Sequence, residues 1–349
     1  MCELYRRKTL KAPMRNSFAI ALIFAACILR ARGDVSVTPT SDVAALQAAL
    51  NATNLTITAV TIQSGADGQF GTYTSFTNPP ITIANGVVLS SGQVAYVGPP
   101  ADPTIDYPEP NWDLMGLGTP EFDAYGPGHI ENFDGSFDVA ALRVDFHLDS
   151  TNSVKFDFIF GSVEFPYWTS EYTDALLVFL DGTDPTNQIA FDKNLQPVQV
   201  GNSFVGLVAT GDLNTAFANP HGMLLKLTTT TAPLPPGEHT LIFEVGDVKD
   251  GNLDSAAFIA NLRGEAGAAG TEPTDPPPSL LVKRTDLQNN TNCVALTWRD
   301  TGVSCVLEQS ECLSGPWTTV DTPWSTNGYF LETAVESTNA TEFYRLRRD

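Results

Sequence analysis

The sequence predicts an all-β protein: a jelly-roll-like β-sandwich with one short N-terminal helix, followed by a smaller β-sandwich. Two observations predict this class. Many short segments are rich in β-branched and aromatic residues, and Gly, Pro, Asn and Asp separate them. A stretch of small residues and prolines, residues 266–278, then divides these segments into two series and predicts a linker between two domains.

Residues 1–33 are predicted to be a signal peptide. Basic residues precede an apolar run at residues 17–29, which has the length of a signal-peptide core and is too short to span a membrane. Small residues at Ala31 and Gly33 predict cleavage before Asp34. Met14 is an alternative start, and an uncleaved N-terminal anchor is an alternative outcome; both still predict export. After the cleavage site, no stretch of the sequence is long and apolar enough to span a bilayer.

Residues 34–265 are predicted to form the first domain. Ser41–Leu50 begins with a Ser-Asp pair that can cap a helix and repeats apolar residues at helical spacing, which predicts the one helix. The later segments have the composition of strands. They are Leu55–Ile62, Gly86–Gly92, Ala140–Leu148, Ser153–Gly161, Asp174–Gly182, Met223–Thr230, His239–Val245 and Ser255–Leu262.

The stretch Gly98–Gly135 differs from the rest of this domain because it is rich in Pro, Gly, Asp and Tyr and has no clear period. A loop of this length is usually functional or an insertion. Its aromatic residues, Trp112 among them, stand beside carboxylates, and that combination suits a surface for a sugar or a peptide. An ordered lid packed on the sandwich is the alternative.

Residues 279–349 are predicted to form the second domain. Its strand-like segments, from Cys293–Trp298 to Glu342–Arg348, have a spacing near that of an immunoglobulin-like sandwich. All three cysteines after the signal segment lie here, at Cys293, Cys305 and Cys312. Three is an odd number, so at most one internal bridge forms, and the sequence leaves open which two cysteines pair.

The net charge of the chain excludes some classes of partner. Residues 34–349 contain 12 basic and 39 acidic residues, a net charge of −27. A surface this acidic repels nucleic acid and anionic membranes. The chain also has no HExxH, no GxSxG elbow and no glycine-rich phosphate loop, which predicts a non-enzymatic protein. The alternatives are a secreted hydrolase that acts through carboxylates near the Gly98–Gly135 loop, and a purely structural envelope component.

An acidic turn is the strongest candidate site. Gly246–Phe258 places Asp247, Asp250 and Asp254 between two predicted strands. Glu164 follows another predicted strand and Asp174 opens a further one, so all five carboxylates converge if these turns share one end of the sandwich. Calcium takes six to eight oxygen ligands, and carboxylates on turns supply them. These five residues are therefore the predicted Ca²⁺ ligands. The alternative is an Asp-rich turn whose side chains only cap backbone amides.

Five ordered motifs of the first domain resemble the choice-of-anchor L domain of bacterial surface proteins. They include GVVLSSGQVAYVGPP, FDFIFGSVEFPYW, TDALLVFLDG, NQIAF and GDVKDGNLDSAAFIANL. The resemblance runs from about Asp42 to Gly264 and retains all five predicted ligands, with departures at Pro100, Val163, Phe165 and Thr173. It implies a secreted or cell-surface location, and it implies no enzymatic activity.

The second domain resembles the small fibronectin type III-like modules that end many exported proteins of Verrucomicrobia and Planctomycetes. The resemblance rests on its LTW, GPW and FYRLR motifs. Taken together, the sequence predicts an exported adhesion or binding protein whose partner is an extracellular glycan or a surface protein. In this interpretation the second domain presents or tethers the first.

Overall fold

The structure is a computed structural model. It describes residues 35–76, 83–98, 110–165, 168–169, 171–191, 195–200, 216–218, 223–273, 281–286, 292–299, 305–312, 315–327, 330–336 and 343–348. The predicted signal peptide and residues 99–109 lie outside these ranges. Within the described ranges, no helix has the length and apolar character needed to cross a membrane.

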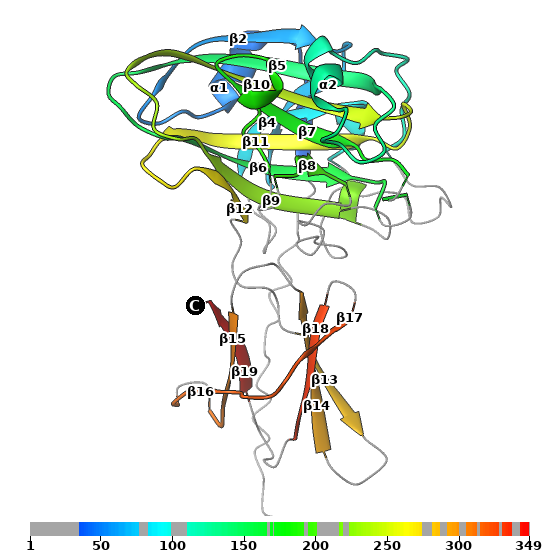
Figure 1. The fold of residues 1–349 in the computed structure, drawn as a ribbon, viewed down its shortest axis with the longest axis vertical. Coiled ribbons are helices and arrows are strands. Elements are labelled where there is room, and N and C mark those ends of the chain that lie inside the picture. Colours follow the sequence, from blue (N-terminus) through cyan, green and yellow to red (C-terminus); the bar gives the residue numbers. More distant parts are fainter. Residues whose placement is uncertain are drawn as a thin grey trace, which may run out of the picture. The chain divides into compact units, whose positions relative to one another are not determined.

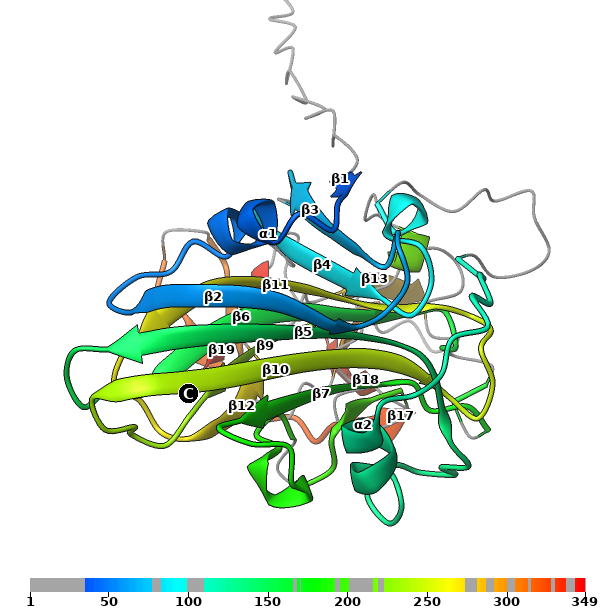
Figure 2. The same ribbon diagram turned by 90° about the horizontal axis from the view of Figure 1, so that it is seen from above.

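The N-terminal domain is a sandwich of two sheets, stacked face to face in Figures 1 and 2. Its larger sheet has seven strands in the order β1 (Ser36–Pro39), β3 (Phe70–Thr74), β4 (Asn85–Ser90), β11 (Ser255–Gly264), β6 (Val154–Ser162), β9 (Met223–Thr230) and β12 (Gly270–Pro273). The smaller sheet has five, in the order β2 (Thr56–Ser64), β5 (Ser136–Leu148), β10 (Gly237–Val248), β7 (Ala175–Leu180) and β8 (Val198–Gln199). Neighbouring strands run antiparallel, so the predicted all-β sandwich is confirmed.

Apolar side chains fill the space between the two sheets because alternate residues of a strand point to the same face. Phe156 of β6 and Phe243 of β10 meet edge to face across this space, with ring centroids 5.0 Å apart. Further apolar clusters lie outside the sheets. One of them packs Phe122 and Tyr125 of helix α2 (Pro120–Tyr125) against Phe179 of β7. The outer face of the smaller sheet is thus partly covered.

Truncation of the central aromatic pair tests this core. Phe243→Ala is expected to lower the free energy of unfolding by about 3–5 kcal/mol, because it removes a buried ring and leaves a cavity that the sheets cannot close. Urea titration followed by circular dichroism measures the change. Leu195→Ala, which truncates a side chain that is two-thirds exposed (67 %), should leave the midpoint unchanged. Equal midpoints for Phe243→Ala and the native protein would contradict this packing.

Several elements differ from the sequence prediction. The predicted helix is present as α1 (Val43–Ala49), and Asp42 rather than Ser41 is its N-cap, accepting from the amide of Ala44 at 3.0 Å. The Gly98–Gly135 stretch contains α2, which no period predicted. Strand β12 lies within residues 266–278, the stretch predicted to be linker, and pairs with β9, so the sheet continues past residue 265. Short 3₁₀ helices are η1 (Val94–Tyr96), η2 (Pro185–Asn187) and η4 (Ala216–Ala218).

The C-terminal module also contains two antiparallel sheets. One orders β13 (Leu281–Asp286), β14 (Asn292–Arg299), β18 (Phe330–Glu336) and β17 (Ser325–Asn327); the other orders β16 (Thr318–Thr319), β15 (Cys305–Ser310) and β19 (Phe343–Arg348). Leu296, Trp298 and Leu307 are buried in its core. Its likeness to fibronectin type III domains stays a prediction.

Candidate functional site

The five predicted carboxylates lie at one end of the N-terminal sandwich. Strand pairing explains why. Ser162, at the end of β6, pairs with Ser255 at the start of β11, which places Glu164 near Asp254. Gly246 of β10 pairs with Ala175 at the start of β7, which places Asp247 near Asp174. Residues 249–254 form the turn between β10 and β11, so Asp250 lies at the same end. The turn is shorter than the sequence predicted, because β10 continues to Val248 and Asp247 therefore lies in the strand.

A sixth carboxylate, Asp138, belongs to this group and was missed by the sequence prediction. It lies near the start of β5, and that start pairs with the end of β10. Its Oδ2 accepts from the amide of Leu114 at 2.9 Å, and its Oδ1 accepts from the amide of Gly116. We call the six residues the acidic cluster. They are Asp138, Glu164, Asp174, Asp247, Asp250 and Asp254.

Burial is the main physical feature of the acidic cluster. Five of its side chains are 1 % exposed or less, and Asp250 is partly exposed. A buried carboxylate loses its hydration, which costs free energy unless hydrogen bonds or opposite charges replace the water. That replacement is incomplete here. Both oxygens of Asp247, Oδ2 of Asp254 and Oε2 of Glu164 are buried and have no hydrogen-bond partner.

Hydrogen bonds hold other oxygens of the cluster. Asp174 accepts from the hydroxyl of Ser255 at 2.7 Å and from the amide of Val248 at 3.1 Å. Asp254 accepts through Oδ1 from the amide of Trp112 at 2.9 Å. The contact with Asp247 lowers the pKa of Asp174, and the contact with Ser91 lowers the pKa of Asp247. Neither contact is a hydrogen bond of regular geometry.

The pKa values of the cluster are raised. Burial is the largest cause in each case, and it raises the pKa of Asp254 to about 7, that of Asp174 to about 8 and that of Glu164 to about 10. Burial also raises the pKa of Asp247. The charged groups that add to these shifts are other carboxylates, chiefly Asp138, Asp174 and Asp250. Repulsion within the cluster therefore strengthens the effect of burial.

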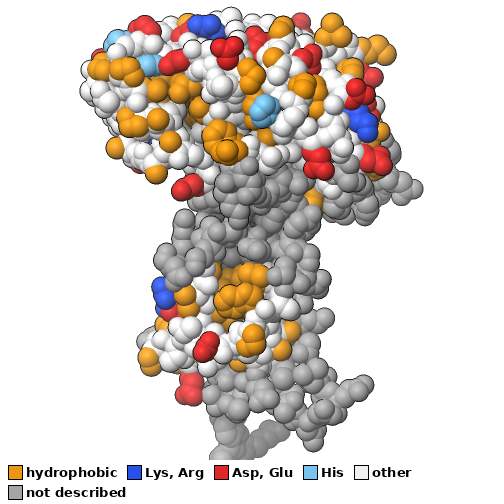
Figure 3. Space-filling view, viewed as in Figure 1, with side chains coloured by type: hydrophobic (Ala, Val, Ile, Leu, Met, Phe, Trp, Pro, Cys, Tyr) orange, Lys and Arg blue, Asp and Glu red, His pale blue; other side chains and the backbone are white. Residues whose placement is uncertain are grey.

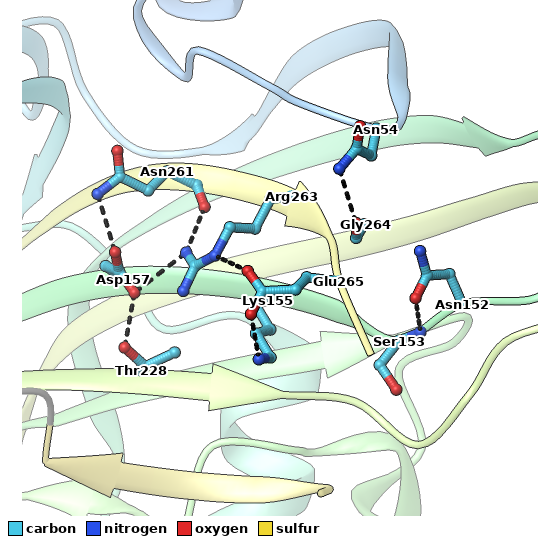
Figure 4. Close-up of polar contacts among 10 residues, drawn as sticks. All are labelled: Asn54, Asn152, Ser153, Lys155, Asp157, Thr228, Asn261, Arg263, Gly264 and Glu265. Atoms are coloured by element: carbon cyan, nitrogen blue, oxygen red, sulfur yellow. Dashed lines mark hydrogen bonds and ion pairs between the residues drawn. The ribbon is translucent and has the colours of Figure 1, made fainter. Parts of the chain in front are cut away.

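Three basic side chains of this domain are engaged away from the acidic cluster. Lys249, in the turn itself, donates to the backbone oxygen of Glu171 at 3.3 Å and lies over the ring of Tyr172. Arg263 and Lys155 belong to the opposite end of the sandwich, where they bond Asp157 and Glu265 (Figure 4). Over the face shown in Figure 3, acidic side chains are spread with few basic ones between them.

An irregular segment, residues 110–118, lies along the acidic cluster, and we call it the strap. Its backbone supplies the amides of Trp112, Leu114 and Gly116 to the cluster carboxylates. In return, the amide of Asp254 donates to the backbone oxygen of Pro110 at 3.0 Å. The strap belongs to the Gly98–Gly135 stretch that was predicted to be either a functional loop or a packed lid, and these hydrogen bonds hold it against the sandwich.

The cluster could offer a metal ion only oxygen ligands, since its six members include no histidine or cysteine. This donor set is the one that Ca²⁺ and Mg²⁺ prefer and that Zn²⁺ does not. Among the described residues, no three Asp, Glu, His or Cys side chains already stand in an arrangement that could hold a metal ion. The orphaned oxygens of Asp247, Asp254 and Glu164 are the observation that fits a cation here, since each is a buried acceptor without a donor.

Comparison with known proteins identifies the family of the N-terminal domain. The sequence profile of the choice-of-anchor L domain matches residues 36–262. The chain belongs to the choice-of-anchor L family. All six residues of the acidic cluster fall inside the matched range, whereas the C-terminal module lies outside it. No curated protein matches the chain. Family membership supports a surface-associated protein, secreted or held at the cell surface, in agreement with the sequence prediction.

Proposed function

We propose that this protein is a non-enzymatic, surface-associated binding protein whose choice-of-anchor L domain takes up Ca²⁺ in the acidic cluster. The single observation that carries the proposal is Asp247. Its side chain is fully buried, neither of its carboxylate oxygens has a hydrogen-bond partner, and its charged neighbours are carboxylates. A bound cation would satisfy both oxygens and would offset the repulsion at once.

Protons are the competing way to neutralise the cluster. The raised pKa values of Asp174, about 8, and Asp254, about 7, mean that protons occupy part of the cluster at neutral pH when no cation is bound. A divalent cation must displace those protons in order to bind. Calcium fits better than Mg²⁺ because it accepts more oxygens and a less regular geometry, as a cluster assembled from strand ends and turns supplies.

Burial also argues against the hydrolase alternative. A catalytic carboxylate has to reach hydrogen-bond distance of its substrate. Five of the six cluster side chains are 1 % exposed or less, and the strap lies along them. An ion reaches such a site after a small opening of the turns, whereas a polymer substrate needs an open cleft.

Isothermal titration calorimetry of the full-length, chelator-treated protein tests the proposal. We expect Ca²⁺ to bind and to release protons at pH 7, so the measured heat should change with the ionisation enthalpy of the buffer. Asp247→Asn should abolish this binding because it removes one charge from the centre of the cluster.

Glu244→Gln is the matched control. Glu244 is also a buried carboxylate, and burial raises its pKa to about 8, but the hydroxyl of Thr119 donates to it at 2.9 Å and it lies outside the cluster. This variant should bind Ca²⁺ like the native protein. Absence of both heat and proton release at millimolar Ca²⁺ would refute the proposal.

A further inference from the structure

Large apolar side chains are exposed along the strap. Among the described residues, seven large hydrophobic side chains are exposed. Three of them belong to the strap, where they fall within a run of six residues, 112–117. Met115 is 88 % exposed, Leu117 81 % and Trp112 39 %. Tyr96, which ends η1, is 45 % exposed and stacks on Trp112, with ring centroids 4.8 Å apart and an angle of 19° between the rings. Apolar side chains exposed one at a time are normal, whereas several that gather on one segment indicate an interaction site.

Hydrogen bonding explains why these side chains do not turn inward. The amides of Trp112, Leu114 and Gly116 point to Asp254 and Asp138, and these bonds fix the backbone of the strap. At Leu117 the strap also forms a single bridge to Phe137 of β5. The side chains of Trp112, Met115 and Leu117 are left outside. The surface is therefore held in place by buried carboxylates, which lowers the entropy that a partner must remove on binding.

The composition of this surface points to a protein partner. Trp, Tyr and Met are the apolar residues that are enriched at the centres of protein interfaces. A stacked, half-exposed Trp and Tyr pair also presents a ring face that attracts the cation of a Lys or Arg side chain.

Charge points to a basic partner. The strap sequence PNWDLMGLG contains no Lys or Arg, and its one charged residue, Asp113, is exposed between Trp112 and Met115. Gly251, in the acidic turn, lies against the carboxylate of Asp113, so the acidic character continues from the strap into that turn. Charges of opposite sign steer a partner onto such a surface.

We infer that the strap and Tyr96 form the docking surface for a protein segment in which Lys or Arg side chains alternate with apolar ones, and that Ca²⁺ in the acidic cluster keeps this surface in shape. The second part of this inference rests on the proposed Ca²⁺ site. The first part does not, because it depends only on the exposed side chains and on their charge.

A labelled peptide of alternating Arg and Leu, titrated with the full-length protein in calcium at 150 mM salt and followed by fluorescence anisotropy, tests the docking surface. Trp112→Ser should weaken binding tenfold or more. This variant keeps the backbone amide that donates to Asp254, so the strap stays anchored. Trp324→Ser is the matched control, since Trp324 is 52 % exposed but belongs to the C-terminal module, and it should bind like the native protein.

Two peptides of the same length define the chemistry. Replacement of Arg by Glu, or of Leu by Ser, should each abolish binding. Equal affinity of Trp112→Ser and the native protein would overturn the docking surface, and so would equal binding of the Arg–Ser peptide. Displacement of the Arg–Leu peptide by neutral oligosaccharides would also overturn it, in favour of a glycan ligand.

A separate measurement tests whether Ca²⁺ keeps the docking surface in shape. If the inference is right, chelation should weaken peptide binding by the native protein, and Asp247→Asn should show the weaker affinity in both conditions. If native binding is the same with calcium and with chelator, while calorimetry still records Ca²⁺ uptake, the link falls and the proposed function stands. If calorimetry records no Ca²⁺ uptake, the proposed function falls, and the Trp112→Ser result still decides the docking surface.

Discussion

Without calcium, the protein is expected to be more stable at pH 5 than at pH 8, and millimolar calcium is expected to reverse this order. The sign follows from the raised pKa values of Asp174, about 8, and Asp254, about 7, against ordinary values near 4 in the unfolded chain. Between those limits the folded state binds protons that the unfolded state has lost. Stability therefore falls as pH rises from about 4 to about 8.

Under the proposed function calcium changes this balance, because it would bind the deprotonated cluster. At pH 8 few protons compete, so Ca²⁺ stabilises the folded state most there, and at pH 5 protons compete with it. We expect the melting temperature at pH 8 to rise by about 5 °C or more on addition of calcium, given about 2–4 °C per kcal/mol for a domain of this size. Differential scanning calorimetry at several pH values, with chelator and with calcium, measures both trends.

Asp247→Asn and Glu244→Gln separate the cluster from other buried acids. Asp247→Asn should remove the calcium effect. Burial also raises the pKa of Glu244 to about 8, so Glu244 adds a pH dependence of the same sign that calcium does not remove, and Glu244→Gln should reduce only that part. A chelated protein whose melting temperature increases from pH 5 to pH 8 would contradict the raised pKa values.

The strands and the acidic turn could be predicted because their signals are local. Alternation and β-branched composition mark β5 and β10, and the Asp250-Gly251 step marks the turn that also carries Asp254. The sequence predicted that Glu164 lies near this turn only if the two turns share one end of the sandwich. The pairing of β6 with β11 fulfils that condition.

The parts that sequence patterns missed depend on contacts between distant segments. Asp138 belongs to the acidic cluster because β5 pairs with β10. The strap lies against the cluster because its backbone amides donate to carboxylates from other parts of the chain. No periodicity records such contacts. β12 is an edge strand of four residues that owes its conformation to β9. Helix α2 did have a local signal, since Thr119 caps it and Pro120 occupies its first turn, a combination typical of helix starts.

Gly92 offers the most direct test of how tightly the acidic cluster is packed. A Cβ atom at this position would lie 1.8 Å from Oδ2 of Asp254 and 2.2 Å from its Cγ, and the Asp254 side chain has no exposed surface into which it could move. Gly92→Ala should therefore displace the carboxylate and break its bond to the amide of Trp112. We expect a loss of about 3 kcal/mol of unfolding free energy, from overpacking and from one lost charged hydrogen bond together. Urea titration measures this loss, and calorimetry should show that Ca²⁺ binding is lost with it.

A double-mutant cycle with Asp254→Ala identifies the cause. If the clash with the carboxylate is what excludes a side chain at residue 92, then Gly92→Ala should cost less than about 1 kcal/mol in the Asp254→Ala background, because the methyl group then fills the vacated space. An equal cost in both backgrounds would mean that the local backbone, and not Asp254, requires glycine. The expected coupling would tie the end of β4, where Gly92 follows Ser90 and Ser91, to the strap through a single carboxylate. The position of the exposed Trp112 would then depend on the state of the buried cluster beneath it.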